Sequence, residues 1–148
     1  MKERATIVCW QRGRVLLVER GRARWSLPGG TIRLGEAPAD AARRELSEET
    51  TLDGQERGYL FQFGGLNKRH HVFFAVLHEA ARPVPNNEIQ RCRWFRPGKV
   101  ATLITSVPTR EIINLLFGHE MTALGSRPRR QPGEPSERQP GLERCGAG

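Results

Sequence analysis

The chain of 148 residues is long enough to bury a hydrophobic core without disulfide bonds and short enough to form one domain. Its 37% hydrophobic and 27% charged residues are the balance of a soluble globular protein, and no apolar run approaches the roughly 20 residues that span a bilayer. The apolar stretch near its start is too short for a secretory signal, so we expect a cytoplasmic protein without a membrane partner.

Charge and cysteine content narrow the possible classes further. A formal net charge of +8 favours contact with polyanions such as nucleotides or nucleic acids. Cys9, Cys92 and Cys145 are an odd number of cysteines without a CxxC spacing. They therefore indicate neither a disulfide framework nor a zinc site.

Short apolar runs rich in β-branched residues predict strands along the first two thirds of the chain. The first two runs flank Gln11-Arg12-Gly13, which predicts a β-hairpin with glycine in its turn. The predicted strands are 5–10, 14–19, 59–63, 71–78 and 90–95.

Two helices are predicted beside these strands. One begins near Ala37 or Pro38 and runs to Glu49 or slightly beyond. The other, 108–118, has a proline in its first turn, ends at a glycine and is expected to pack by one side. The apolar residues of that side are Ile112, Ile113, Leu115 and Leu116.

The composition changes after about Gly118, so we place a domain at 1–120 and a basic tail rich in Pro, Gly and Arg at 121–148. Within 125–148 one leucine is the only large apolar residue. Such a segment cannot offset its ordering entropy by burial, and we expect it to be disordered. Its arginines are either solvated or bind an acidic partner such as RNA.

Three glutamates lie close together in the first predicted helix. At about 100° per residue, Glu48 and Glu49 fall to either side of Glu45, and small apolar residues form the neighbouring arc. Arg44, one turn before Glu48, can pair with it. The arc is either a solvated surface or the site of a bound cation.

The preceding stretch LPGG favours the cation. Gly29 and Gly30 let the backbone approach a ligand closely, and their carbonyls can join carboxylates around a hard cation. Mg²⁺ bound in this way is usually shared with substrate phosphates, which favours attack of an activated water on phosphorus.

The spacing of these residues forms a long and specific pattern. Starting at Gly30, five residues lead to Glu36, seven more lead to Arg44-Glu45-Leu46-x-Glu48-Glu49, and Leu52 follows. The pattern resembles the signature box of the Nudix hydrolases, with similarity over about 6–117. The resemblance implies an α/β fold, namely a Nudix α/β/α sandwich with a mixed central sheet. It also implies a Nudix-type nucleotide pyrophosphohydrolase, an enzyme that hydrolyses a phosphoanhydride in a nucleoside diphosphate linked to another moiety.

The resemblance further implies a metal site. Glu45, Glu48 and Glu49 would bind Mg²⁺, or Mn²⁺ in its place, with a backbone carbonyl of Gly29 or Gly30.

It also implies roles for the neighbouring charged residues. Arg44 would orient the glutamates, and Glu36 would act at the helix start or behind the metal ligands. The catalytic base would be Glu45 or Glu88, which matches a region where many members supply another acidic residue.

Two positions depart from the family's pattern. Thr51 stands where a glycine usually ends the helix, and a β-branched residue adopts a left-handed helix end poorly. Gly54 can take over that end a few residues later. Ala37 stands where a capping serine or threonine is common, so the helix start lacks a side-chain cap.

Features outside the box bear on the substrate. Family features for ADP-ribose, dinucleoside polyphosphates and NADH are not found, and what remains resembles the MutT-like group, which acts on nucleoside triphosphates. Lys68, Arg69 and His70 can bind phosphate oxygens or a base edge, or can form a plain polar loop before a strand. Trp25 can stack on a nucleobase, although an aromatic residue there also suits a core.

Two other functions stay open. The basic tail beside an intact box also fits an RNA 5′-end pyrophosphohydrolase, and a non-catalytic Nudix-fold module would bind nucleotides or nucleic acid. The intact glutamates favour the enzyme. The sequence leaves the oligomeric state open, with a dimer among the alternatives.

Overall fold

The computed structural model describes residues 1–53, 57–65 and 67–125. Within these residues, four strands precede the helix that carries the glutamates, and three more strands and two helices follow it. The elements are β1 (Lys2–Gln11), β2 (Arg14–Glu19), β3 (Trp25–Ser26), β4 (Gly29–Thr31), α1 (Pro38–Thr50), β5 (Arg57–Gly64), β6 (Lys68–Val76), β7 (Arg91–Phe95), α2 (Pro97–Val100) and α3 (Val107–Gly125).

Strand β1 lies at the centre of the sheet. It pairs in parallel with β6, from Lys2 opposite Lys68 to Trp10 opposite Val76. Its first half pairs antiparallel with β4, and its last residues pair antiparallel with β2. The strand order is β3-β2-β1-β6-β5, with β4 on β1 and β7 on β2, so the sheet is mixed, as predicted.

The predicted hairpin between β1 and β2 is confirmed. Its central residues, Arg12 and Gly13, have φ angles of 52° and 77°. These are the left-handed values that a two-residue turn needs to match the twist of its strands.

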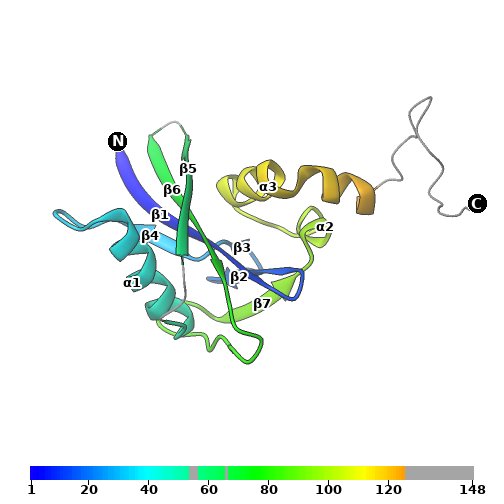
Figure 1. The fold of residues 1–148 in the computed structure, drawn as a ribbon, viewed down its shortest axis with the longest axis horizontal. Coiled ribbons are helices and arrows are strands. Elements are labelled where there is room, and N and C mark those ends of the chain that lie inside the picture. Colours follow the sequence, from blue (N-terminus) through cyan, green and yellow to red (C-terminus); the bar gives the residue numbers. More distant parts are fainter. Residues whose placement is uncertain (54–56, 66, 126–148) are drawn as a thin grey trace, which may run out of the picture.

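Helices cover both faces of the sheet (Figure 1), with α1 on one face and α2 and α3 on the other. On the α1 face, Ile7 belongs to a core that contains Leu46. On the other face, Val8 belongs to a core that contains Val100 and Ile112. Successive residues of a strand point to opposite faces, so β1 supplies both cores. The predicted α/β/α sandwich is confirmed.

Some boundaries differ from the prediction. Strand β6 begins at Lys68, three residues before the predicted start, because its pairing with β1 continues through polar residues. Helix α3 breaks its helical geometry at Phe117 (φ −129°, ψ 23°) but continues to Gly125, across the proposed boundary at 120. Leu115, predicted on the packing side, is 64% exposed. The short elements β3, β4 and α2 are absent from the prediction, because two to four residues show no periodicity.

Two predicted features fall wholly or largely outside the described residues. They are the proposed helix end at Gly54 and the tail beyond 125. The disorder of the tail therefore stays a prediction. Within the described ranges, no helix is long and apolar enough to cross a membrane.

Candidate active site

Helix α1 begins without a side-chain cap, as predicted. Ala37 precedes it in an extended conformation (φ −72°, ψ 146°), and no side chain caps the first turn. Pro38 takes the first helical position, where its fixed φ suits the helix and its missing N–H needs no partner.

The end of α1 differs from one expectation. The helix stops at Thr50, because Thr51 adopts the left-handed conformation (φ 62°, ψ 7°) and donates its N–H to the Ser47 carbonyl at 2.9 Å. The helix therefore ends within the described residues, at the position where the family usually has glycine. Thr51 thus takes the left-handed conformation that glycine usually takes at a helix end, which strains the backbone because threonine is β-branched.

The glycine loop packs directly against the helix carboxylates. Gly29 has a φ of 155°, and a Cβ there would meet the Ala5 carbonyl oxygen at 2.2 Å. A Cβ on Gly30 would lie 2.3 Å from the carboxylate carbon of Glu45. Gly29 therefore needs glycine, whereas a side chain at position 30 would displace the Glu45 carboxylate from its place.

Glu49 is almost fully buried, with 2% of its surface exposed. One carboxylate oxygen accepts the N–H of Gly29 at 3.2 Å, and the other pairs with Arg20. Burial raises the pKa of Glu49 to about 7, although the Arg20 charge and the Gly29 N–H act in the opposite direction. A further cation beside this carboxylate would offset the effect of burial.

Arg44 contacts all the other glutamates of the box. Its Nε and Nη2 donate to the two carboxylate oxygens of Glu36 at 2.8 and 2.9 Å. Its Nη1 donates to Glu45 at 2.9 Å and to Glu48 at 3.4 Å. The pair with Arg44 lowers the pKa of Glu36 to about 2, so Glu36 is charged and fixes the plane of the guanidinium.

Glu88 reaches the same place from the loop between β6 and β7. That loop is fixed to the end of α1, because the N–H of Asn86 donates to the Glu49 carbonyl at 3.1 Å and Ile89 is buried. A carboxylate oxygen of Glu88 lies 3.7 Å from Nε of Arg20. The side chain is 61% exposed, so water reaches it freely.

These groups line a cavity of about 390 Å³ in which four glutamates and four arginines of the described residues, Arg33 among them, meet; we call it the acidic cavity after its carboxylates. Carboxylate and carbonyl oxygens are the ligands that Mg²⁺ and Mn²⁺ prefer. Within the described ranges, no three acidic, histidine or cysteine side chains converge into a ready-made metal cage, and Glu45 and Glu49 contact arginines. The donor set fits a hard divalent cation, which would take over carboxylate contacts now made by arginines. The lining includes Gly29, Gly30, Arg44, Glu45, Glu48, Glu49 and Glu88, together with Arg4 and Arg20.

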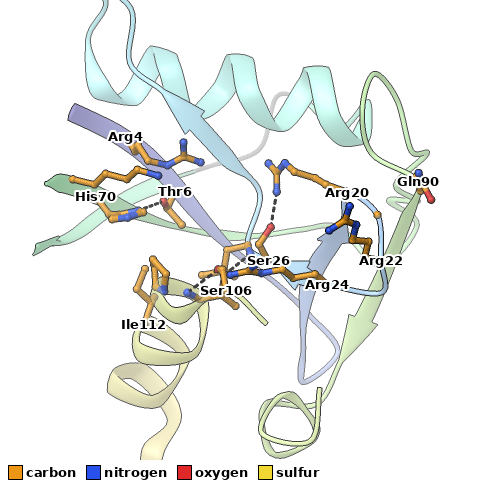
Figure 2. Close-up of a pocket in the computed structure, with 15 residues that line it drawn as sticks. Arg4, Thr6, Arg20, Arg22, Arg24, Ser26, His70, Gln90, Ser106 and Ile112 are labelled. Carbon is orange, nitrogen blue, oxygen red and sulfur yellow. Dashed lines mark hydrogen bonds between the residues drawn. The ribbon is translucent and has the colours of Figure 1, made fainter. Parts of the chain in front are cut away.

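A second cavity of about 770 Å³ adjoins the first and shares Arg4 and Arg20 with it. Figure 2 shows Arg4 and His70 on one side of this basic cavity and Arg22 and Arg24 on the other. No acidic side chain of the described residues lines it. The two cavities thus form one continuous site, in which the charged lining changes from balanced carboxylates and arginines to cationic side chains alone.

Strand β6 divides the predicted substrate-binding residues between its two faces. Lys68 and His70 line the basic cavity, and Nδ1 of His70 lies 3.0 Å from the Thr6 hydroxyl. Burial, together with nearby cations, lowers the pKa of His70 to about 4, so its ring is neutral at pH 7. Arg69 lies on the other face and pairs with Glu3 at 3.4 Å. The predicted contact of Arg69 with the substrate does not fit this position, because neighbouring residues of a strand point to opposite faces of the sheet.

Trp25 lies in the core and not on a cavity wall. It is 5% exposed and packs edge to face on Phe95, with ring centroids 5.1 Å apart. The Arg91 guanidinium covers it at 4.9 Å from the ring centroid. Too little of the ring is accessible to stack on a nucleobase, so the expected stacking role of Trp25 is corrected to a packing role.

Two arginines of the site, Arg4 and Arg20, carry no recognisable motif in the sequence. Arg20 contacts Glu49, donates to the Gly29 carbonyl at 3.1 Å and lies 2.5 Å from the Ser26 hydroxyl. Arg4 is half-buried and lines both cavities. The available signal for Arg20 is its position directly after a strand and before a glycine, where site residues often lie.

Fold and site together define a phosphoanhydride-hydrolysing type of enzyme, and the comparisons with known proteins agree. The family model described as the NUDIX domain matches residues 1–116. The chain is 30% identical over 104 residues to phosphatase NudJ of Escherichia coli K12, which is 63% of this chain and 68% of that protein. It is 31% identical over 136 residues to CMP-5′-(N-acetyl-N-hydroxy-3-aminopropyl)phosphonate hydrolase of Streptomyces rubellomurinus, which is 83% of this chain and 64% of that one. A Bacillus subtilis protein with the provisional name 8-oxo-dGTP diphosphatase is 29% identical over 108 residues, 71% of either chain.

Solved structures share the fold. A structure from Chromobacterium violaceum, provisionally assigned to the Nudix hydrolases, is 27% identical with a TM-score of 0.71, over 84% of this chain and 88% of that chain. MutT, from work on Aliivibrio salmonicida and Vibrio cholerae, is 16% identical with a TM-score of 0.67, over 80% and 98% of the two chains.

This chain belongs to the Nudix hydrolase family. The predicted Nudix-type pyrophosphohydrolase is confirmed as the class of enzyme. Membership implies a divalent metal ion and a nucleotide-type substrate.

Proposed function

We propose that this enzyme hydrolyses a phosphoanhydride in a nucleoside diphosphate linked to another moiety, with Mg²⁺, or Mn²⁺ in its place, as cofactor. A nucleoside triphosphate would yield a nucleoside monophosphate and pyrophosphate. The observation that carries the proposal is the junction of the two cavities at Arg4 and Arg20. A phosphate chain at this junction lies between carboxylates suited to a metal and cationic side chains suited to phosphate oxygens.

The residues of the acidic cavity would have two roles, metal binding and the positioning of the metal ligands. Glu45, Glu48 and Glu49 would hold the metal with a carbonyl of Gly29 or Gly30. When bound, the ion supplies positive charge to the phosphate oxygens and lowers the pKa of a water. Arg44, itself fixed by a carboxylate, keeps Glu45 and Glu48 at the cavity.

Two carboxylates are candidates for the catalytic base. Glu45 lies against Gly30 and is held by Arg44, whereas Glu88 is exposed and contacts Arg20 at 3.7 Å. Replacing the base by glutamine should remove the acidic limb of the pH profile of kcat/KM, while replacing a metal ligand should instead raise the metal concentration needed. Comparison of Glu45→Gln with Glu88→Gln therefore assigns the base.

A substrate panel tests the proposal as a whole. It contains nucleoside triphosphates, oxidised dGTP, a CMP-linked phosphonate, ADP-ribose, dinucleoside polyphosphates, NADH and 5′-triphosphate RNA, with phosphate and pyrophosphate assayed separately. We expect pyrophosphate from a nucleoside triphosphate, only with Mg²⁺ or Mn²⁺. Turnover in EDTA would overturn the metal assignment, and turnover of RNA alone would favour the RNA 5′-end alternative.

A further inference from the structure

The basic cavity has an unusual charge balance. Its cationic side chains are not matched by acidic ones on the cavity wall. Arg20 is ion-paired with Glu49 and Glu88, whereas the described part of the chain offers no ion pair to the others. Like charges gathered without counterions repel one another, so they are most stable facing an anion. The unpaired members are Arg4, Arg22, Arg24 and Lys68.

Arg4 is the least solvent-exposed member of this group. It projects from the central strand β1, is half-buried and lines both cavities. A partly buried guanidinium normally has an acidic partner in direct contact. Among the described residues Arg4 makes no direct ion pair, and the charges of Glu45 and Glu49 act on it only from a distance. Its place at the junction suits an anion that extends from the acidic cavity into the basic one.

The opposite wall is a strained loop that presents two further arginines. Arg22 and Ala23 have φ angles of 59° and 56°, in the region that non-glycine residues avoid. Buried Glu19 holds this form by accepting the N–H of Ala23 at 2.9 Å and the Nε of Arg91 at 2.5 Å. Glu19 is 3% exposed and does not line the cavity, so it fixes the loop without neutralising Arg22 and Arg24.

Among the described residues the lining offers cationic and hydroxyl groups and a few apolar side chains, and the imidazole of His70 is its one aromatic ring. Trp25, next to Ser26 of the lining, is buried in the core. Recognition in this cavity therefore depends on charge more than on base stacking.

We infer that the part of the substrate that enters the basic cavity carries a phosphoryl group of its own, separate from the scissile diphosphate. Arg4 and Lys68 bind it from one wall, and Arg24 binds it from the other. The inference rests on the proposed function, because it takes the acidic cavity as the place of the scissile bond. A 3′-phosphorylated nucleoside 5′-polyphosphate has this chemistry. A 5′-triphosphorylated RNA supplies the same group as its first internucleotide phosphate.

A binding experiment tests the inference without turnover. Calorimetry on the full chain with Mg²⁺ compares nucleoside 3′,5′-bisphosphates with the 5′-monophosphates, in the adenosine and guanosine series. We expect the bisphosphate to bind at least tenfold more tightly, with the preference falling as salt increases. Equal affinities, or no binding of either bisphosphate, would overturn the inference.

Matched variants locate the effect. Lys68→Gln and Arg24→Gln should each reduce the preference at least threefold, since each removes a charged partner of the phosphoryl group. Arg93→Gln, at an exposed arginine outside both cavities, should keep the preference. Melting temperatures within a degree or so of the parent check that each variant is folded. A preference that Lys68→Gln and Arg24→Gln leave unchanged would contradict the assigned site.

Steady-state kinetics distinguish a small nucleotide from RNA as the source of the additional phosphoryl group. They also distinguish failure of this inference from failure of the proposed function. A lower KM for the 3′-phosphorylated nucleoside triphosphate alone assigns a small nucleotide, and an equal decrease for a triphosphorylated dinucleotide assigns RNA. Metal-dependent turnover of triphosphates without any such preference would overturn the inference and leave the proposed function standing. A bisphosphate preference without turnover of any panel substrate would overturn the proposed function and leave this cavity as an anion site.

Discussion

At the scale of single residues, two arginines hold the carboxylates that a metal would need. Arg44 contacts Glu45 and Glu48 from within the helix, and Arg20 contacts Glu49 from the end of β2. These contacts compensate buried negative charge before a metal arrives. They also keep the side chains at the cavity, although the carboxylates of the described residues do not converge until a cation replaces the arginine contacts.

Glu49→Gln tests the most deeply buried of the proposed metal ligands. The change keeps side-chain size and most of the helix propensity but removes one negative oxygen donor. We expect turnover to fall at least about a hundredfold, roughly 2.7 kcal/mol of transition-state stabilisation. The melting temperature without metal should stay close to the parental value, because Gln carries no charge to bury.

A matched variant and a clear contrary outcome complete this test. Glu79→Gln, at an exposed glutamate paired with Arg12, should leave turnover unchanged. Steady-state rates and melting curves with and without Mg²⁺ check both variants. Near-parental turnover of a folded Glu49→Gln protein would show that Glu49 is not a metal ligand.

His70 makes a prediction about pH. Its pKa is lowered to about 4 in the folded chain, against an ordinary value of about 6.5. As the pH falls below 6.5, the unfolded chain binds a proton that the folded chain does not bind until about pH 4, so stability is lost over that window. The loss should be about 1–2 kcal/mol, allowing for the partial solvation of the ring.

The pH prediction is checked by urea unfolding at pH 7.5 and pH 5.0. His70→Asn cannot titrate, so the difference between its free energy of unfolding and that of the parent should shrink towards pH 5.0. His78→Asn, at an exposed histidine, should follow the parent at both pH values. A constant difference between His70→Asn and the parent would contradict the lowered pKa.

At the scale of elements, the end of α1 shows a local conflict that the fold overrides. Thr51 takes a left-handed conformation that costs a β-branched residue about 1–2 kcal/mol. The conformation turns the chain immediately after the glutamates, and the loop that carries Glu88 then packs on the helix end through Asn86. The position of Glu88 therefore depends on the helix end, whose last carbonyls at Glu49 and Thr50 accept the N–H groups of Asn86 and Val84.

Thr51→Gly should relieve the strain. We expect an increase of about 0.5–1 kcal/mol in the free energy of unfolding, after allowing for the greater freedom of glycine in the unfolded chain. Ser47→Gly, in the regular part of the same helix, should instead lower it by about 0.5 kcal/mol. Denaturant unfolding of both variants measures the contrast, and a loss of stability in Thr51→Gly would show that the threonine fits its place.

At the scale of the whole molecule, the site gathers residues from five separate parts of the chain, one of which is the glycine pair of β4. Arg4 comes from β1, Arg20 from the end of β2, Glu49 from α1 and Glu88 from the loop before β7. Strand β1 makes this possible, because it pairs with β2, β4 and β6 and brings their ends to one side.

Removal of the tail tests whether the described fold is sufficient. A chain that ends at Gly125 keeps all of α3 and loses a segment whose composition buries almost nothing. We expect its melting temperature and its turnover of small nucleotides to remain nearly unchanged. Loss of turnover on RNA alone would assign the tail to RNA binding, and a large fall in melting temperature would contradict its expected disorder.

The sequence by itself determined the local parts of this protein. The hairpin turn at Arg12 and Gly13 and the start of α1 at Pro38 follow from the conformations that a few consecutive residues allow. The contact of Arg44 with Glu48 follows in the same way from the spacing of one helical turn. The spacing of the box was long enough to indicate the family, and with it the class of chemistry.

Only the tertiary structure decided which distant groups meet. Arg20 reaches Glu49 across 28 intervening residues, and one step along β6 turns Lys68 into the cavity and Arg69 away from it. Trp25 is buried for the same reason, since strand pairing and not its own spacing sets its surroundings. Periodicity reports which face a residue shares with its neighbours. It does not report what that face packs against, because strand order and register depend on the whole chain at once.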